Sequence, residues 1–175
     1  MIIFRIKPWY LGVCLLATLA MPYAVQAADI LKLKASLSYN LAKFVTWPKQ
    51  AQAEEFWRLC YFSEEYDLVF GRLADKKLHG KVLRTKRLRD VSGALACHII
   101  YIDVKKRKLL PRLFMATKNK PILTLSDSTG FVEQGGMVEI VSTGTNIRFK
   151  VNRSEMEKSG LMMSSRALKL AIDVK

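Results

Sequence analysis

The sequence contains few residues of the kinds that build catalytic or metal sites. Of its 175 residues, two are histidine and three are cysteine. The motifs G-x-S-x-G, G-x-x-x-x-G-K-[ST], H-E-x-x-H and G-x-G-x-x-G do not occur. His79 and His98 lie far apart in the chain, and two cysteines without a neighbouring pair of histidines do not make a zinc set. We therefore expect a protein that is not an enzyme and that holds no metal and no cofactor.

The chain also lacks a linker rich in serine, glycine or proline, and no segment repeats, so its length fits one domain. Only the first 27 residues stand apart. They carry Arg5 and Lys7 without an acid, then an apolar core at 11–20, then small residues at 25–27, which is typical of a secretory signal peptide. That apolar core spans only about 15 Å, half of a bilayer core, which argues against a membrane anchor. We expect residues 1–27 to be removed on export and residues 28–175 to form the domain.

Acidic residues are scarce. The chain has 15 Asp and Glu and 29 Lys and Arg, which gives a net charge of +14. A basic protein usually suggests nucleic acid as a partner, but an exported protein does not meet it. We expect anionic lipid headgroups, cell-wall polymers or acidic faces of membrane proteins instead. Two basic segments are expected to form one positive rim if their strands are neighbours, namely Lys81, Arg84, Lys86, Arg87, Lys105 and Lys106. The alternative is that these charges are solvated and only aid solubility.

Two cysteines remain after export, because Cys14 belongs to the leader. Cys60 and Cys97 each lie in an apolar run that resembles a strand. In an oxidising compartment an even number of cysteines forms a disulfide by default. A redox-sensing pair is the alternative interpretation.

Hydrophobic periodicity predicts helices that alternate with strands. The predicted helices are 29–47, 66–78, a segment that starts at 105 with Pro111 in its first turn, 153–158 and 164–174, with one helical turn at 90–96. The predicted strands are 56–62, 81–88 as an edge strand, 97–103 as a strand covered on both faces, 122–125, and a hairpin of 137–141 with 147–151. This order predicts an α/β fold, a single-domain layered sandwich with a central mixed sheet flanked by helices.

Several segments together resemble the YfiR-like family of bacterial periplasmic proteins. SYNLAKFVTWP (38–48) resembles the family's Y-x-x-x-K-F-V-x-W-P opening, and CHIIYI (97–102) resembles its C-H-I-L-F-I strand. LTLSDSTGFVEQGGMVEI (123–140) is similar to L-T-V-S-D-x-x-x-F-x-x-Q-G-G-M-I, and NIRFKVN (146–152) and GLMMSSRALKLA (160–171) resemble the family's ending. Cys60 and Cys97 match the family's cysteine pair. A second pair that some members carry is missing here, so control through a second bridge should be absent.

The resemblance implies a regulator without enzyme activity that acts in the periplasm, often as a homodimer. It implies that the protein binds and represses the periplasmic sensor part of an inner-membrane diguanylate cyclase, which lowers cyclic di-GMP and restrains biofilm formation. A cell-wall or outer-membrane-associated protein is a further class of partner. The family also implies an α/β sandwich with a central sheet.

The loop after residue 125 carries the most specific part of this resemblance and is a candidate partner contact. Its members are Ser126, Asp127, Phe131, Glu133, Gln134, Gly135, Gly136 and Met137. We expect Gly135 and Gly136 to set the turn, Asp127 and Gln134 to hydrogen-bond within the loop, and Phe131 to enter the core.

Two other functions compete with a cyclase repressor. The first is a module that senses a ligand or the cell wall, is coupled to a histidine kinase or receptor, and has the loop 126–136 lining its site. The second is an exported hydrolase, for which Asp127, Glu133 and His98 are the candidate residues.

Overall fold

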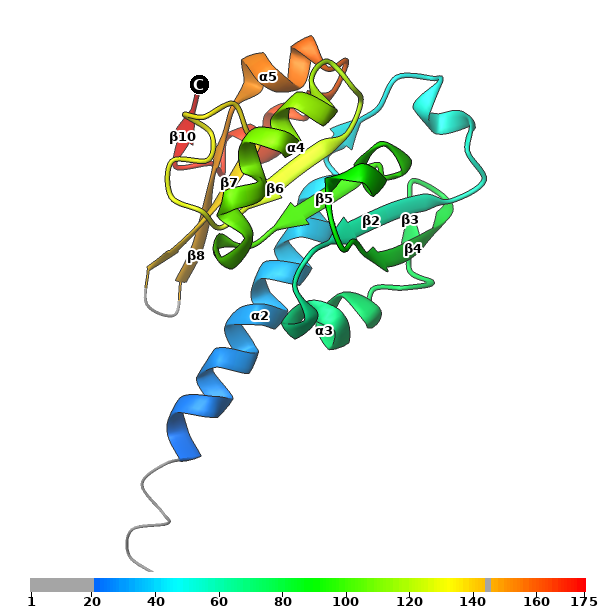
Figure 1. Ribbon diagram of the computed structural model, residues 1–175. Coiled ribbons are helices and arrows are strands. Elements are labelled where there is room, and N and C mark those ends of the chain that lie inside the picture. The colour runs from blue at the N-terminus through cyan, green and yellow to red at the C-terminus, as the bar shows by residue number, and fades with distance from the viewer. Residues whose placement is uncertain (1–20, 144–145) are drawn as a thin grey trace, which may run out of the picture.

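The structure, a computed structural model, describes residues 21–143 and 146–175 (Figure 1). Most of the expected signal peptide lies outside these ranges, and its last residues, 21–27, begin helix α2 (Met21–Ala42). The prediction of an export signal is therefore not tested by the fold. Within the described ranges, no helix is both long and apolar enough to cross a membrane.

A mixed sheet of eight strands forms the centre of the domain, in the order β10-β8-β7-β6-β5-β2-β4-β3 (Figure 1). The strands are β2 (Trp57–Tyr61), β3 (Lys77–Leu78), β4 (Lys81–Arg87), β5 (Ile99–Ile102), β6 (Leu123–Ser126), β7 (Val138–Thr143), β8 (Asn146–Val151) and β10 (Asp173–Val174). Strands β4, β2, β5, β6 and β7 are parallel neighbours, whereas β8 pairs antiparallel with β7 and β3 pairs antiparallel with β4. This arrangement confirms the predicted α/β fold with a mixed sheet.

Two hydrophobic cores lie on opposite faces of the sheet, because successive side chains of a strand point to opposite sides. On β5, Ile99 and Tyr101 belong to the larger core, while Ile100 and Ile102 belong to the smaller one. All four are fully buried, so the continuous apolar run predicted as a strand covered on both faces is confirmed.

Helices supply the other half of each core. The larger core receives side chains from α2, α3 (Asp67–Gly71), α5 (Arg153–Lys158) and α6 (Ser165–Leu168). The smaller core receives them from the 3₁₀ helix η3 (Val91–Ala96) and from α4 (Leu110–Thr117). Pro111 lies in the first turn of α4, as predicted, where the missing N–H costs no helical hydrogen bond. The remaining elements are η1 (Ala51–Ala53), η2 (Glu64–Tyr66), η4 (Val104–Leu109), β1 (Val45–Thr46) and β9 (Met162–Met163).

The first predicted helix ends earlier than residue 47. Helix α2 stops at Ala42, and Val45 and Thr46 instead pair with β9 as the short strand β1. β-Branched residues favour a strand, and the residue before Pro48 is excluded from the helical region. The pairing with β9 brings the C-terminal part of the chain against the end of α2.

Two further helix predictions were wrong for most of their length. In the segment 66–78 the helix ends at Gly71, Asp75 adopts a positive φ of 65°, and β3 follows. In the segment 164–174 the helix ends at Leu168, and the chain then pairs with β8 through Ile172 N–H to Phe149 C=O. In both places an open sheet edge offers backbone partners that a longer helix would leave unpaired. Strand β3 pairs only with Lys81 and Val82 of β4, so the predicted edge strand is covered at its amino end and, within the described ranges, has no strand on that side over 84–87.

Candidate functional site

The loop between β6 and β7 is held by hydrogen bonds that its own sequence supplies. Ser126 Oγ accepts from Ser128 N–H at 3.0 Å. Gln134 Nε2 donates to Gly130 C=O at 2.8 Å, as expected of a bond within the loop. Thr124 Oγ1 accepts from Met137 N–H at 3.2 Å where the loop re-enters the sheet. The loop therefore presents a defined surface.

Gly135 and Gly136 of the loop have separate roles. Gly135 has a φ of +105°, a region that favours glycine. At Gly136 a Cβ would lie 2.2 Å from the ring of Phe131, so only glycine lets the chain pass this ring. Phe131 is fully buried and packs on Phe114 of α4 with ring centroids 5.5 Å apart. The predicted roles of Gly135 and Phe131 are confirmed, whereas Gly136 is needed for the close approach of the Phe131 ring and not for the turn itself.

Asp127 differs from its predicted role because it bonds outside the loop. Its Oδ2 pairs with Lys34 Nζ of α2 at 2.5 Å, and its Oδ1 accepts from Val104 N–H at 2.7 Å. Both side chains of the ion pair are largely buried, with 14% of Lys34 and 6% of Asp127 exposed. Asp127 therefore ties the end of β6 to α2 and to the start of η4.

Strand β7 carries a buried carboxylate, that of Glu139. Glu139 is 3% exposed, accepts from Val132 N–H at 3.4 Å and lies 3.4 Å from Lys150 Nζ. Lys150 also lies 3.4 Å from Glu133, whose pKa is lowered by a hydrogen bond to its own backbone N–H and by Lys150. In the sequence Glu139 alternates with the apolar residues Val138 and Ile140. The sequence carries no local signal for its burial, because Glu139 lies just beyond the last position of the family motif.

The residues proposed for a hydrolase do not come together. Asp127 follows the carboxyl end of β6, whereas His98 precedes the amino end of the parallel neighbour β5. At about 3.3 Å per residue, about 16 Å of strand separates them. His98 Nδ1 accepts from Arg58 N–H at 3.0 Å, and its ring stands edge-on to Trp57. Asp127 and Glu133 are each paired with a lysine, and neither is paired with His98 in the described part of the chain.

The buried phenols between β5 and η2 are also unsuited to act as bases. The hydroxyls of Tyr66 and Tyr101 are 2.9 Å apart, and burial raises the pKa of both phenols well above the ordinary value. They therefore stay protonated at neutral pH. Among the described residues, no group of three or more His, Cys, Asp or Glu could hold a metal ion.

A pocket of about 280 Å³ opens between α4, the loop and α5. Its floor is mostly apolar, with Phe114 and Met137, and Glu155 and Lys118 stand among its polar lining residues. Gln134, Gly135 and Met137 of the loop all contribute to its wall. The loop thus faces a concave surface as well as solvent.

The six predicted rim residues are spread over the length of β4 and the start of η4. Lys81, at the amino end of β4, donates to the Glu54 carbonyl at 2.6 Å. Arg84 lies 3.3 Å from Asp75, Lys86 is exposed, and Lys105 pairs with Glu65. Arg87 and Lys106 line one crevice beyond the carboxyl end of β4, together with Arg89 of the same basic segment. The structure therefore brings Arg87 and Lys106 together and places Lys81 at the other end of the strand.

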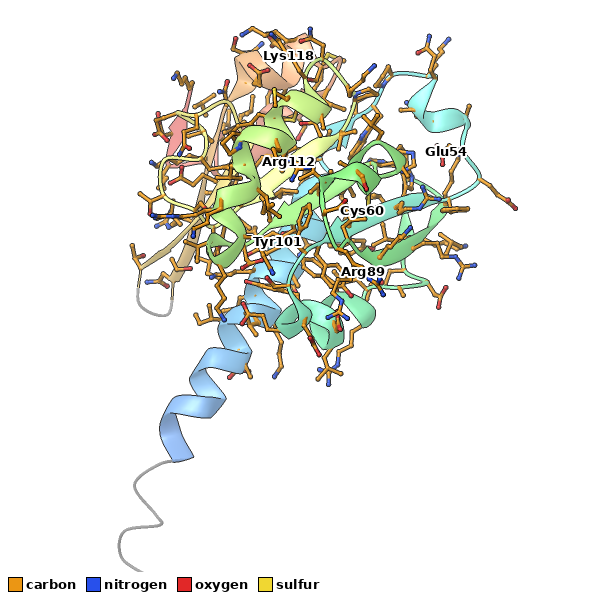
Figure 2. All side chains as sticks on the ribbon, viewed as in Figure 1. Glu54, Cys60, Arg89, Tyr101, Arg112 and Lys118 are labelled. Atoms are coloured by element: carbon orange, nitrogen blue, oxygen red, sulfur yellow. A yellow bond between two sulfur atoms is a disulfide. The ribbon has the colours of Figure 1, made fainter. Side chains whose placement is uncertain are left out.

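Cys60 and Cys97 form a disulfide with a Cα–Cα distance of 6.0 Å, which confirms the predicted bridge. Cys60 lies near the carboxyl end of β2, and Cys97 lies between η3 and β5. Both are buried in the smaller core (Figure 2). The bridge fastens η3 over this face of the sheet.

Comparison with known proteins gives one family and a shared fold. A family model described as YfiR/HmsC-like matches residues 31–172. No curated protein matches the chain in a sequence comparison. An ABC domain from Streptococcus pneumoniae in complex with L-Trp is similar in structure, with a TM-score of 0.55 and 12% identity over 81% of this chain and 60% of that one. A conserved domain protein from Vibrio cholerae O1 biovar El Tor also has a TM-score of 0.55 and 12% identity, over 83% of this chain and 60% of that one. The matched region spans about 60% of the length of either structure, and the likeness shows the fold.

Proposed function

Since the chain belongs to the YfiR/HmsC-like family, we propose that it is a periplasmic regulator that binds and represses the sensor part of an inner-membrane diguanylate cyclase. Repression lowers cyclic di-GMP and restrains biofilm formation. The family match over residues 31–172 is the observation that carries this proposal.

Three features of the molecule support a binding role in an oxidising compartment. The Cys60–Cys97 disulfide persists where thiols are not kept reduced, as in the periplasm. The candidate hydrolase residues are separated or paired with lysines. The β6–β7 loop is tied down by internal bonds but keeps Glu133 and Gln134 exposed, as a preorganised contact surface requires.

Deletion of the gene tests the proposed function. Cellular cyclic di-GMP and biofilm mass should rise, and expression of the wild-type protein should restore both. A periplasmic pull-down with the tagged protein should recover a membrane cyclase. Unchanged cyclic di-GMP after deletion, with no cyclase recovered, would overturn the proposal.

A loop variant tests whether the partner meets the β6–β7 loop. Glu133→Lys reverses an exposed charge beside Lys150, and Glu157→Lys reverses an exposed charge beside Arg153 on α5. The two changes are matched in charge, exposure and ion pairing. We expect Glu133→Lys to release repression and Glu157→Lys to retain it. Equal repression by both variants would remove the loop from the contact.

A ligand-sensing module is the second candidate function, and the pocket of about 280 Å³ favours it because loop residues line its wall. In this role a bound compound would control a receptor or histidine kinase. Thermal-shift measurements with small aromatic compounds, L-Trp among them, and with cell-wall fragments test it. Met115→Trp narrows the pocket from its exposed rim and should abolish a stabilising shift, whereas Met162→Trp, an exposed position elsewhere, should keep it. The absence of any stabilising compound would favour the repressor alone.

We also propose that the protein forms a homodimer through the open edge of β10. Beside this edge Leu170, Ile172 and Val174 are 63%, 49% and 42% exposed. An exposed strand edge with apolar neighbours favours pairing with another chain. Light scattering should give a dimer for the wild type and a monomer for Ile172→Lys. A monomeric wild type at high concentration would contradict this assembly.

A further inference from the structure

A crevice with a volume of about 460 Å³ lies where β2 and β4 reach their carboxyl ends. Its lining consists of Phe62, Glu64, Arg87, Leu88, Arg89 and Lys106. Figure 2 shows Arg89 on the face turned to the viewer, below Cys60. In open α/β sheets, ligands bind in crevices outside the carboxyl ends of the parallel strands. The position of this crevice therefore fits a binding site.

The crevice carries an excess of positive charge. Three cations line it against the single carboxylate of Glu64. Arg87 lies 3.3 Å from Glu64 and 3.3 Å from Asp67, but no described residue forms an ion pair with Arg89 or Lys106. Asp90 beside Arg89 already accepts hydrogen bonds from Ser92 N–H and Oγ. Two cations are thus left for a ligand.

Arg87 shows that carboxylates bind in this crevice. Its guanidinium already contacts two carboxylates, and the Glu64 side chain is 87% exposed. An exposed ion pair of this kind contributes at most about 1 kcal/mol, so a carboxylate from another molecule can replace Glu64 at little cost. Arginine binds carboxylates through a planar fork of N–H donors.

The apolar base of the crevice indicates which kind of molecule supplies the carboxylates. Phe62 and Leu88 are 5% and 4% exposed, and they form an apolar base below the cations. A flat lipid surface cannot reach a recessed base, whereas a protein segment can insert an apolar side chain between two acidic ones. The shape and charge together favour an acidic peptide segment.

We propose that this crevice docks an acidic segment of the membrane signalling partner, with Arg89 and Lys106 as its main contacts. The identity of the partner rests on the proposed function, but the preference for acidic peptide follows from the crevice itself. The attraction also acts at long range and weakens with salt.

Binding of a defined probe tests this preference. The probe is a short fluorescein-labelled peptide in which leucines alternate with Glu and Asp, and its binding to the protein is measured by fluorescence anisotropy. The double variant Arg89→Glu/Lys106→Glu should bind it about tenfold more weakly or worse, because charge-assisted contacts become repulsive. The control Lys49→Glu/Lys169→Glu makes the same change in net charge at exposed positions elsewhere and should bind as the wild type does. All four positions are exposed, and matching melting temperatures will show that each variant is folded.

Three results would overturn the proposal. They are no binding of the acidic peptide, an equal loss in the control variant, and tighter binding of phosphatidylglycerol vesicles or inorganic phosphate that depends on Arg89 and Lys106. A cellular measurement separates this inference from the proposed function. If gene deletion raises cyclic di-GMP but the double variant represses as the wild type does, the repressor role stands and the crevice is not its contact.

Discussion

Lys34 in α2 and Asp127 at the end of β6 form an ion pair of 2.5 Å, although 93 residues separate them in the chain. Both side chains are mostly shielded from water, and Asp127 uses its second oxygen to accept from Val104 N–H. The pair fastens the first helix to the loop that carries the most specific family motif. Its integrity should therefore govern both stability and the shape of the candidate contact surface.

Removal of the cation should be costly. Lys34→Met leaves the Asp127 carboxylate buried without its partner, and we expect a loss of about 3 kcal/mol in the free energy of unfolding. Urea denaturation measures it. The control is Lys32→Met on the same helix, where the pair with Asp29 is more than half exposed and contributes at most about 0.5 kcal/mol. Similar losses in both variants would mean that the Lys34–Asp127 pair is not shielded in solution.

Gly136→Ala should destabilise the loop because its new methyl group would overlap the ring of Phe131. We expect a loss of about 2 kcal/mol or more, as for other overpacked cores. Gly71→Ala is the control, since no atom lies within 4 Å of the added carbon. A second variant, Gly136→Ala with Phe131→Leu, should recover part of the loss relative to the additive expectation. A neutral Gly136→Ala would show that the ring can move aside.

Reduction of the disulfide should lower stability by about 4 kcal/mol, because the bridge joins residues 37 positions apart and restricts the unfolded chain. Cys60→Ala/Cys97→Ala should show the same loss, measured by urea denaturation with and without dithiothreitol. The reductant should change the wild type alone. If the wild type is unaffected by reductant under denaturing conditions that expose the bridge, the two thiols are not linked.

Local patterns predicted those parts of the fold that depend on neighbours in sequence. The β7–β8 hairpin follows from the two alternating runs, and the disulfide follows from two cysteines in apolar strands. The burial of Phe131 was predicted only together with the family motif. The prediction of a helix over 164–174 was wrong beyond Leu168. The apolar residues of this segment suit a helix, but the open edge of β8 offered hydrogen-bond partners to its backbone. No local pattern records which strand will have a free edge.

The contacts of the β6–β7 loop were predicted less completely than the fold, because they too depend on residues far apart in the sequence. Glu133 and Gln134 were identified from the motif, but the partner of Asp127 lies in α2 and that of Glu139 lies in β8. Arg89 belongs to the predicted basic segment, but no local pattern indicates that it lies beside Lys106 rather than beside Lys81. Its closeness to Lys106 arises from the order of β4, β2 and β5 in the sheet.

Acid should destabilise the protein through His98. Its ring is 6% exposed, and Nδ1 accepts from Arg58 N–H, which requires a neutral ring. Burial lowers the pKa of His98, although Glu54 opposes this shift. The unfolded chain, with a histidine pKa of about 6.5, binds the proton more readily than the folded chain does. Above about pH 6.5 His98 is neutral in both states, and the full free energy of unfolding is present. As the pH falls below that value, the unfolded chain takes up the proton first, so the free energy of unfolding decreases progressively.

Urea denaturation from neutral pH down to about pH 5 measures this loss. His98→Gln should be less stable than the wild type at neutral pH, because the buried acceptor is altered, but its stability should decline less on acidification. His79→Asn is the control, since His79 has a φ of 46° that asparagine tolerates, and it should retain the decline of the wild type. An unchanged pH dependence in His98→Gln would show that other groups cause the decline. If both histidine variants flattened the curve equally, the effect could not be assigned to the contact between His98 and Arg58.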